Sequence, residues 1–432
     1  MSERFLNSHQ IEVVERVLDG RPEPVVLLAP PGSGIGAVIA AICTRAIAEG
    51  PRERVLIVTR SRLRAQELQQ RLAESSPTVD ATLVTGDSFR LFLASGLPGA
   101  GVILVTAQLL TRSDIAPAIG ANPWAVVISD AVHGGALTRS VLEKIKTTRG
   151  KLFIHDWPEK YPLSEHDRLI SWYDLPRHEL GLHPDREIEL WEYNRSPEEL
   201  EALKEFMRII DESLPASTPP GIRQNLVAAA TSSPLAFEQV LMRAVRNSER
   251  RQVDEDLDDA QTENESEWRP HPAAVSALLA LVDNIGADKK VGYVIDALRT
   301  RKEMHPRIVV FCRMVSTTAY LEEVLSEAED LQDRPILRVD ASTMYGETSA
   351  RLAQFHAMPC VLITTEGVGT ELNLADADLA IMYDGATTER QIQRVWGAID
   401  RPGRTTPPKL VVLAAGERTR LPPESYLLPD SR

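Results

Sequence analysis

Short apolar runs alternate with amphipathic stretches in two parts of this chain, and the alternation predicts most of the fold. In the first part we expect strands within 25–29, 55–59, 81–85, 101–112, 124–135 and 151–158. In the second part we expect strands at 307–312, 336–339, 360–364, 379–383 and 409–413, with helices at 289–299 and 317–327. Apolar strands separated by helices are typical of a parallel, doubly wound sheet. The pattern therefore predicts an α/β protein with two lobes.

The stretch between the two parts has a different pattern. Residues 186–285 contain one strand-like piece and then several amphipathic helical segments. From Asp254 to Glu267 the chain has eight acidic residues and no basic one. Such a run favours solvated, disordered chain, so we expect an acidic disordered loop at 248–268. The predicted domains are 1–185, a helical inter-lobe segment at 186–285, and 286–432.

The composition restricts the possible partners and cellular compartment of the protein, but it does not indicate a function. The net charge of −14 supplies no global basic field for nucleic acid or membrane, so any nucleic-acid contact has to be local. The three cysteines lie far apart in apolar runs, which is typical of buried thiols in a reducing compartment. The N-terminus has no basic-then-apolar signal and no apolar run reaches about 18 residues. We expect a cytoplasmic protein with no membrane partner.

The stretch 24–43, PVVLLAPPGSGIGAVIAAIC, joins an apolar run, a glycine turn and a helical segment. A strand, a glycine turn and a helix N-terminus form the phosphate cradle of a P-loop, where backbone N–H groups and the helix dipole attract phosphates. The cradle residues are the candidate nucleotide-binding set: Pro31, Gly32, Ser33 and Gly34. A working P-loop ends in Gly-Lys-Ser/Thr, but this chain has Ile35 and Gly36 there. An ordinary glycine turn that meets no nucleotide is the alternative reading.

Six segments in order resemble the motifs of a superfamily 2 helicase core, in particular the Swi/Snf-type branch with HepA/RapA-like members. Besides the P-loop, they are VLIVTRSRLRAQELQQRL (55–72), WAVVISDAVH (124–133), RIVVFCRMVSTTAYLEEVL (307–325), TTEGVGTELNLADADLAIMYD (364–384) and QRVWGAIDRPGR (393–404). The segment 222–245 also resembles the helical inter-lobe segment of that branch. The resemblance implies two RecA-like lobes, ATP and Mg²⁺ as cofactors, and nucleic acid as partner.

The departures from the family pattern all fall on catalytic positions. The resemblance places Ile35 at the phosphate-binding lysine and Gly36 at the magnesium-binding hydroxyl. It places Ala131 at the glutamate that orients the attacking water, and Ala398 at the first arginine finger. Positioned acid–base groups contribute about 10²–10⁴ in rate, and an arginine finger about 10³–10⁵. We therefore expect a decayed ATP site, with weak binding of ATP and Mg²⁺ at best.

Other motif positions are retained. The resemblance makes Asp130 a residual magnesium ligand and keeps His133 beside it. Arg401 stands at the second arginine finger, and a one-residue shift would let Arg394 substitute for the first. Gln10 stands where some helicases read adenine. Structural polarity at a strand end and ordinary surface arginines are the alternative readings.

The nucleic-acid candidates are Arg60, Arg62 and Asn373, which lie in segments that contact the bound strand in helicases. A solvated helix face is the alternative reading for the two arginines. Phosphate contacts need only modest local charge, so the acidic composition does not rule them out. DNA is favoured over RNA by the resemblance.

Three functions remain after the sequence is read. The first is a helicase-like, non-motor subunit that binds nucleic acid, a protein partner, or both, in a DNA-processing or defence assembly. The second is a divergent but active ATP-dependent translocase that uses Arg394 and Arg401. The third is a pure protein-interaction module, which the acidic balance favours.

Overall fold

A computed structural model gives the fold. It describes residues 6–50, 53–75, 77–86, 88–89, 101–113, 115–130, 135–156, 166–214, 218, 220–253, 268, 270–285, 288–301, 303–386 and 388–416. The chain forms two compact units. The first unit comprises the chain up to Pro184 together with Asp400–Thr406, and the second comprises Asp185–Ile399 and the chain from Pro407.

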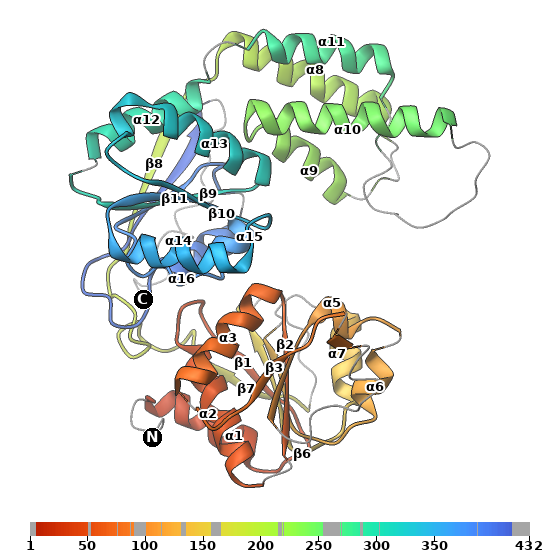
Figure 1. Ribbon diagram of the computed structural model, residues 1–432, viewed down its shortest axis with the longest axis vertical. Coiled ribbons are helices and arrows are strands. Elements are labelled where there is room, and N and C mark those ends of the chain that lie inside the picture. Colours follow the sequence, from red (N-terminus) through yellow and green to blue (C-terminus); the bar gives the residue numbers. More distant parts are fainter. Residues whose placement is uncertain are drawn as a thin grey trace. The chain divides into compact units, whose positions relative to one another are not determined.

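The first unit is built on a seven-stranded sheet in which all strands are parallel (Figure 1). Its strands are β1 (Val25–Leu28), β2 (Arg54–Thr59), β3 (Ala81–Leu83), β4 (Gly101–Thr106), β5 (Trp124–Asp130), β6 (Thr147–His155) and β7 (Arg168–Ser171). The order across the sheet is β3-β4-β2-β5-β6-β1-β7. Every residue of β1 and β5 is buried, as expected for strands covered on both faces.

Helices cover both faces of this sheet. On one face, α1 (Ser8–Leu18), α2 (Ile35–Ala48) and α3 (Arg62–Ser75) enclose one apolar cluster. The other face is covered by α5 (Ala107–Leu110), α6 (Ala116–Gly120) and α7 (Gly135–Lys144), over a second cluster. The side chains of β1 alternate between the clusters: Val25 and Leu27 join the first, Val26 and Leu28 the second.

The second unit contains a six-stranded sheet, again with all strands parallel. Its strands are β8 (Glu187–Tyr193), β9 (Arg307–Cys312), β10 (Ile336–Val339), β11 (Cys360–Thr365), β12 (Leu379–Met382) and β13 (Lys409–Ala415), in the order β10-β11-β9-β12-β13-β8. The helices of this lobe are α12 (Lys289–Arg301), α13 (Val315–Glu327), α14 (Tyr345–Ala357), α15 (Glu366–Gly369) and α16 (Glu389–Ile399). Two parallel sheets flanked by helices confirm the predicted α/β fold with two lobes.

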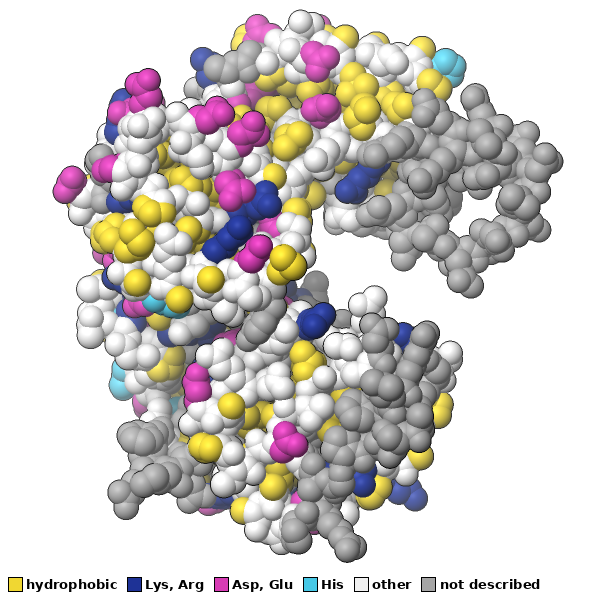
Figure 2. All heavy atoms as spheres, viewed as in Figure 1, with side chains coloured by type: hydrophobic (Ala, Val, Ile, Leu, Met, Phe, Trp, Pro, Cys, Tyr) yellow, Lys and Arg dark blue, Asp and Glu magenta, His cyan; other side chains and the backbone are white. Residues whose placement is uncertain are grey.

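A group of helices belongs to the second unit and has its own core. It comprises α8 (Pro197–Ser213), α9 (Pro220–Ala230), α10 (Pro234–Val253) and α11 (Pro272–Asp283). Proline at the first position suits a helix start, because that N–H has no intrahelical partner. Phe206, Phe237 and Trp268 pack edge to face in this core. Hydrophobic side chains are visible along these helices in Figure 2.

The segment 186–285 contributes more than helices. Its first strand, β8, pairs in parallel with β13 from Glu187 to Tyr193 and forms one edge of the second sheet. At its other end, residues 248–253 of the expected acidic loop belong to α10, and Trp268 is buried. The acidic run 254–267 lies outside the described residues.

Candidate functional site

The predicted phosphate cradle follows β1 directly. Gly32 and Gly34 have φ values of 90° and 85°, a left-handed backbone that glycine adopts without strain. Ser33 is fully buried and turned inward, since its N–H and its hydroxyl both donate to the Pro30 carbonyl, at 3.2 and 2.7 Å. One amide and the only hydroxyl of the turn are therefore engaged within the turn itself.

Gln10 lies against this turn. A Cβ atom on Gly34 would come within 2.7 Å of the Gln10 Nε2 atom. The Gln10 side-chain oxygen accepts a hydrogen bond from the Asn7 N–H at 3.1 Å, which helps to cap α1. Gln10 is buried and thus contributes to the structure of the cradle. Adenine recognition by Gln10 stays a prediction.

Gly34→Ala is expected to lower the free energy of unfolding by about 2–3 kcal/mol. The left-handed backbone costs a Cβ-bearing residue about 1–2 kcal/mol, and displacing Gln10 loosens a helix cap worth about 1 kcal/mol. Gly20→Ala is the matched control, because Gly20 has a φ of 77° but open space around its Cα. Urea unfolding measures both, and equal losses would contradict the contact with Gln10.

Arg71, on α3, lies beside the first turn of α2. A Cβ atom on Gly36 would meet the Arg71 side chain, with Nε at 3.0 Å, Cδ at 3.2 Å and Cζ at 3.3 Å. The family pattern has a serine or threonine at this position. A side chain at this position would therefore be tight against the guanidinium group, which would have to shift by a few tenths of an ångström.

Asp130, at the carboxyl end of β5, is paired with an arginine. The Arg64 Nε atom donates to Asp130 Oδ2 at 2.7 Å, and Arg64 Nη1 donates to Glu67 Oε2 at 2.8 Å. The exposed fractions of the Arg64 and Asp130 side chains are 14% and 8%. Burial disfavours the charge on Arg64, but Asp130 and Glu67 together raise its pKa. The carboxylate that would face magnesium already holds an internal cation.

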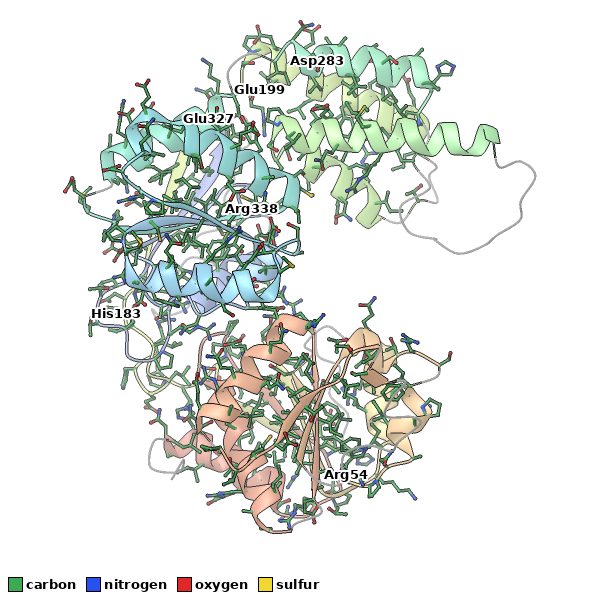
Figure 3. The ribbon with its side chains drawn as sticks, in the orientation of Figure 1. Arg54, His183, Glu199, Asp283, Glu327 and Arg338 are labelled. Atoms are coloured by element: carbon green, nitrogen blue, oxygen red, sulfur yellow. The ribbon has the colours of Figure 1, made fainter. Side chains whose placement is uncertain are left out.

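Arg401 belongs to the first unit and lies in a cationic environment. Burial lowers the pKa of Arg401 to about 10. Glu67 opposes this shift, while Arg64, Arg71 and Arg60 add to it through like-charge repulsion. Its neighbour Asp400 is fully buried and fixes the segment: Asp400 Oδ1 accepts from the backbone N–H of His183 (labelled in Figure 3) at 3.1 Å, and Oδ2 from Arg177.

The role of α3 is not recognised from the sequence alone. Arg64, Glu67 and Arg71 are spaced by three and four residues, which aligns them along one side of α3, and Arg60 precedes the helix by two residues. We call Arg64, Glu67 and Arg71 the charged stripe of α3. The sequence spacing predicts that these residues share a helix face. The residues that they lie against, Gly36, Asp130 and Arg401, come from three other segments of the chain. Arg60, Arg64 and Arg71 are only partly exposed, whereas charged residues in a helix are expected from the sequence to face solvent.

The other predicted site residues do not form part of this cluster. Arg62 and Asn373 are exposed, in the first and second units respectively. Ala398 is fully buried in α16, where its carbonyl accepts from the Leu374 N–H at 3.0 Å. Arg394 is partly buried in the same helix. Ala131 and His133 lie outside the described residues.

Arg394 interacts electrostatically with Glu366, the first residue of α15. Burial raises the pKa of the Glu366 carboxyl to about 7, although Arg313, Gln391 and Arg394 each lower it. Gln391 Nε2 donates to the carboxylate at 3.2 Å, and Arg313 Nε lies 3.9 Å from it. Arg394 thus faces a carboxylate of its own lobe.

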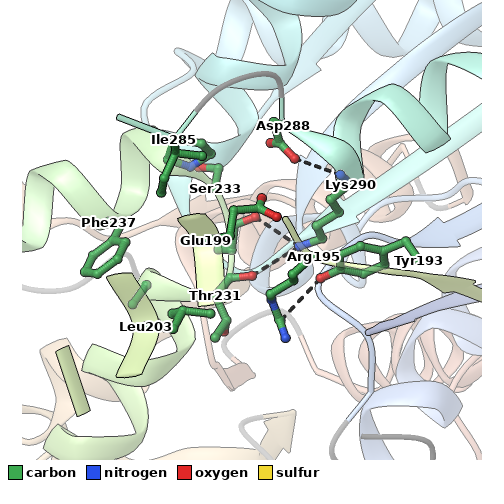
Figure 4. A pocket seen from close by; sticks show the side chains of 13 residues that line it. Tyr193, Arg195, Glu199, Leu203, Thr231, Ser233, Phe237, Ile285, Asp288 and Lys290 are labelled. Atoms are coloured by element: carbon green, nitrogen blue, oxygen red, sulfur yellow. Dashed lines mark hydrogen bonds between the residues drawn. The ribbon is translucent and has the colours of Figure 1, made fainter. Parts of the chain in front are cut away.

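A small pocket of about 30 Å³ lies in the second unit, where the helical group meets the α/β lobe (Figure 4). The buried Lys290 Nζ donates to Asp384 Oδ1 at 2.8 Å and to the Ser232 carbonyl at 2.9 Å, and it lies 3.8 Å from the centre of the Tyr383 ring. The Ser232 hydroxyl donates to Asp384 Oδ2 at 2.9 Å. The polar groups next to this pocket thus satisfy one another and join the α9–α10 turn to the lobe.

Residues 289–406 match the family model of the helicase conserved C-terminal domain. Together with the two parallel-sheet lobes, this match indicates the fold of a helicase core. Among solved structures, the chain is similar to the Hef helicase domain of Pyrococcus furiosus, with a TM-score of 0.51 and 15% sequence identity. The alignment covers 95% of this chain and 96% of that one. A comparison with curated proteins finds no match.

Within the described ranges, no helix has both the length and the apolar character needed to cross a membrane. The same ranges contain no group of three or more histidine, cysteine or acidic side chains placed to hold a metal ion.

Proposed function

We propose that this chain is a helicase-like, non-motor subunit that binds nucleic acid, a protein partner, or both, in a DNA-processing or defence assembly. On this proposal its ATP site has decayed, and the chain derives from the Swi/Snf-type, HepA/RapA-like branch that its motifs resemble. The two lobes then serve as a docking platform. The protein takes no part in ATP-driven translocation.

One observation supports the proposal: two positions that the family pattern assigns to Mg²⁺·ATP, Asp130 and Gly36, lie against arginine side chains of the protein itself. Arg64 holds the carboxylate of Asp130 at 2.7 Å, and Arg71 lies beside Gly36. Ile35 provides no cation for the phosphates. These residues do not fit a magnesium-bound triphosphate, so we derive no hydrolytic step. On this proposal the site lacks its catalytic residues, and arginine side chains now balance the charges that remain around it.

The proposal predicts that the purified full-length chain hydrolyses Mg²⁺·ATP slower than about 10⁻² s⁻¹, with or without DNA. Typical enzymes reach about 1–10³ s⁻¹, and loss of one positioned acid–base group alone costs about 10²–10⁴. Phosphate release in a coupled assay measures the turnover. DNA-stimulated turnover near 1 s⁻¹ would instead favour a divergent, active translocase.

Nucleic-acid binding separates the platform from a pure protein-interaction module. We propose that DNA is the nucleic acid and that the exposed Arg62 and Asn373 contribute to its contact surface. Titration with single- and double-stranded DNA at two salt concentrations tests this, because phosphate contacts weaken steeply as salt rises. Binding that is absent at low salt would leave protein interaction as the function.

A further inference from the structure

The Glu366 side chain lies between the start of α15 and α16. Its exposed fraction is 18%. The carboxyl oxygen Oε2 accepts a hydrogen bond from Gln391 Nε2, on α16, at 3.2 Å. The other oxygen, Oε1, is buried and has no hydrogen-bond partner in the described part of the chain. Within those residues the carboxyl group therefore has one hydrogen bond, and its donor is a neutral amide.

Arg313 does not form a hydrogen bond with this carboxyl group. Its Nε atom lies 3.9 Å from Glu366 Oε1, which is beyond hydrogen-bond distance. Its Nη2 atom instead donates to the Gly385 carbonyl at 3.5 Å. Like Glu366 Oε1, the Arg313 Nε atom is buried without a hydrogen-bond partner among the described residues. The two residues thus do not form the closed ion pair that would hold the carboxyl group in its charged form.

Other charged and titratable groups surround Glu366. Arg394, on α16, favours the charged carboxylate, whereas Asp384, after β12, disfavours it. Cys312, the last residue of β9, adds no charge, because burial raises the pKa of its thiol well above the ordinary value. For Glu366 itself, burial is the largest influence and raises the pKa of its carboxyl from 4.5 to about 7. Burial with one neutral donor therefore outweighs the attraction of Arg313 and Arg394.

From these contacts we propose that Glu366 is a pH-sensitive switch in the second lobe: its protonated carboxyl keeps α15 against α16, and its ionisation favours separation of the two helices. The physical reason is that water reaches the buried oxygen once the helices separate. Because the carboxyl binds its proton more tightly in the closed arrangement, the stabilisation is complete below about pH 4.5 and is lost as the pH rises through about 7. The switch needs no nucleotide, nucleic acid or partner protein.

Hydrogen exchange of the full chain at pH 6 and pH 8 tests the switch. The reporting amides are those of Thr370, Glu371 and Leu372, which donate to α15 carbonyls. Protection factors remove the pH dependence of unprotected exchange. We expect the protection of these amides to fall about tenfold from pH 6 to pH 8. This is the proton-linkage effect of a carboxyl whose pKa is 4.5 when the helices are apart and about 7 when they are in contact.

Glu366→Gln removes the titrating group and keeps the shape of the side chain. Protection of the same amides should then change by less than about twofold between the two pH values. Glu323→Gln is the matched control, because Glu323 is an exposed glutamate on α13 of the same lobe, and this variant should keep the tenfold fall. Glu366→Ala replaces Glu366→Gln if the glutamine variant does not melt cooperatively. Protection that is independent of pH in the unaltered chain would overturn the switch, and so would a tenfold fall that persists without the Glu366 carboxyl.

Discussion

Lys290→Ala is expected to lower the free energy of unfolding of the second unit by about 3–5 kcal/mol. Removing one partner of a buried ion pair leaves the other charge uncompensated, and Asp384 is as buried as Lys290. The change also removes the donor to the Ser232 carbonyl at 2.9 Å. Chemical denaturation measures the loss. Hydrogen exchange should rise first at the α9–α10 turn, which Lys290 holds to the lobe.

Lys289→Ala is the control for this prediction. Lys289 is the preceding residue in α12, it has the same charge, and it is exposed. Surface substitutions of this kind change stability by less than about 0.5 kcal/mol. If the two variants unfold at the same denaturant concentration, Lys290 does not join the helical group to the lobe.

Repair of the ATP site is the second prediction with a large expected effect. Ile35→Lys, Gly36→Thr and Ala131→Glu restore the family residues, but Arg64 still pairs with Asp130 and Arg71 still lies against position 36. We expect Mg²⁺ to strengthen ATP binding by about tenfold or more only when Arg64→Ala and Arg71→Ala accompany these three changes. A charged hydrogen bond of about 1.5–3 kcal/mol corresponds to at least this factor. Calorimetric titration of ATP with Mg²⁺ and with EDTA measures the difference.

The threefold variant that keeps both arginines is the control. On our account it binds ATP equally well with Mg²⁺ and with EDTA, because Asp130 remains paired with Arg64. A full Mg²⁺ response of this control would show that the arginines do not obstruct the site. Thermal melts of all variants establish that they are folded before affinities are compared.

The buried strands could be predicted because their sequences have only one stable environment. The run 308–312 is apolar without interruption, and β9 covers it together with the preceding Arg307. β10 at 336–339 agrees as well. β7 was not predicted, since Arg168–Ser171 is short, mixed in polarity and at the edge of its sheet. Short edge strands depend on pairing with a neighbour, which no local pattern reveals.

Only part of the candidate site could be predicted from the sequence, for a similar reason. Ile35 and Gly36 stand out locally, because the glycine turn fixes where lysine and a hydroxyl belong. The partner of Asp130 is 66 residues away, and Asp400 contacts His183 across 217 residues. Sequence spacing reveals which residues share a helix face, but not which face meets another segment. The compensating arginines therefore required the structure.

The dependence of ATP binding on Mg²⁺ in the unaltered chain tests our account most directly. Calorimetric titration compares the affinity of the full chain for ATP in Mg²⁺ and in EDTA. Because Arg64 already neutralises Asp130, we predict affinities that agree within about threefold, a difference of less than 1 kcal/mol. Binding that is at least tenfold tighter with Mg²⁺ would contradict a site whose cations have been replaced by arginine.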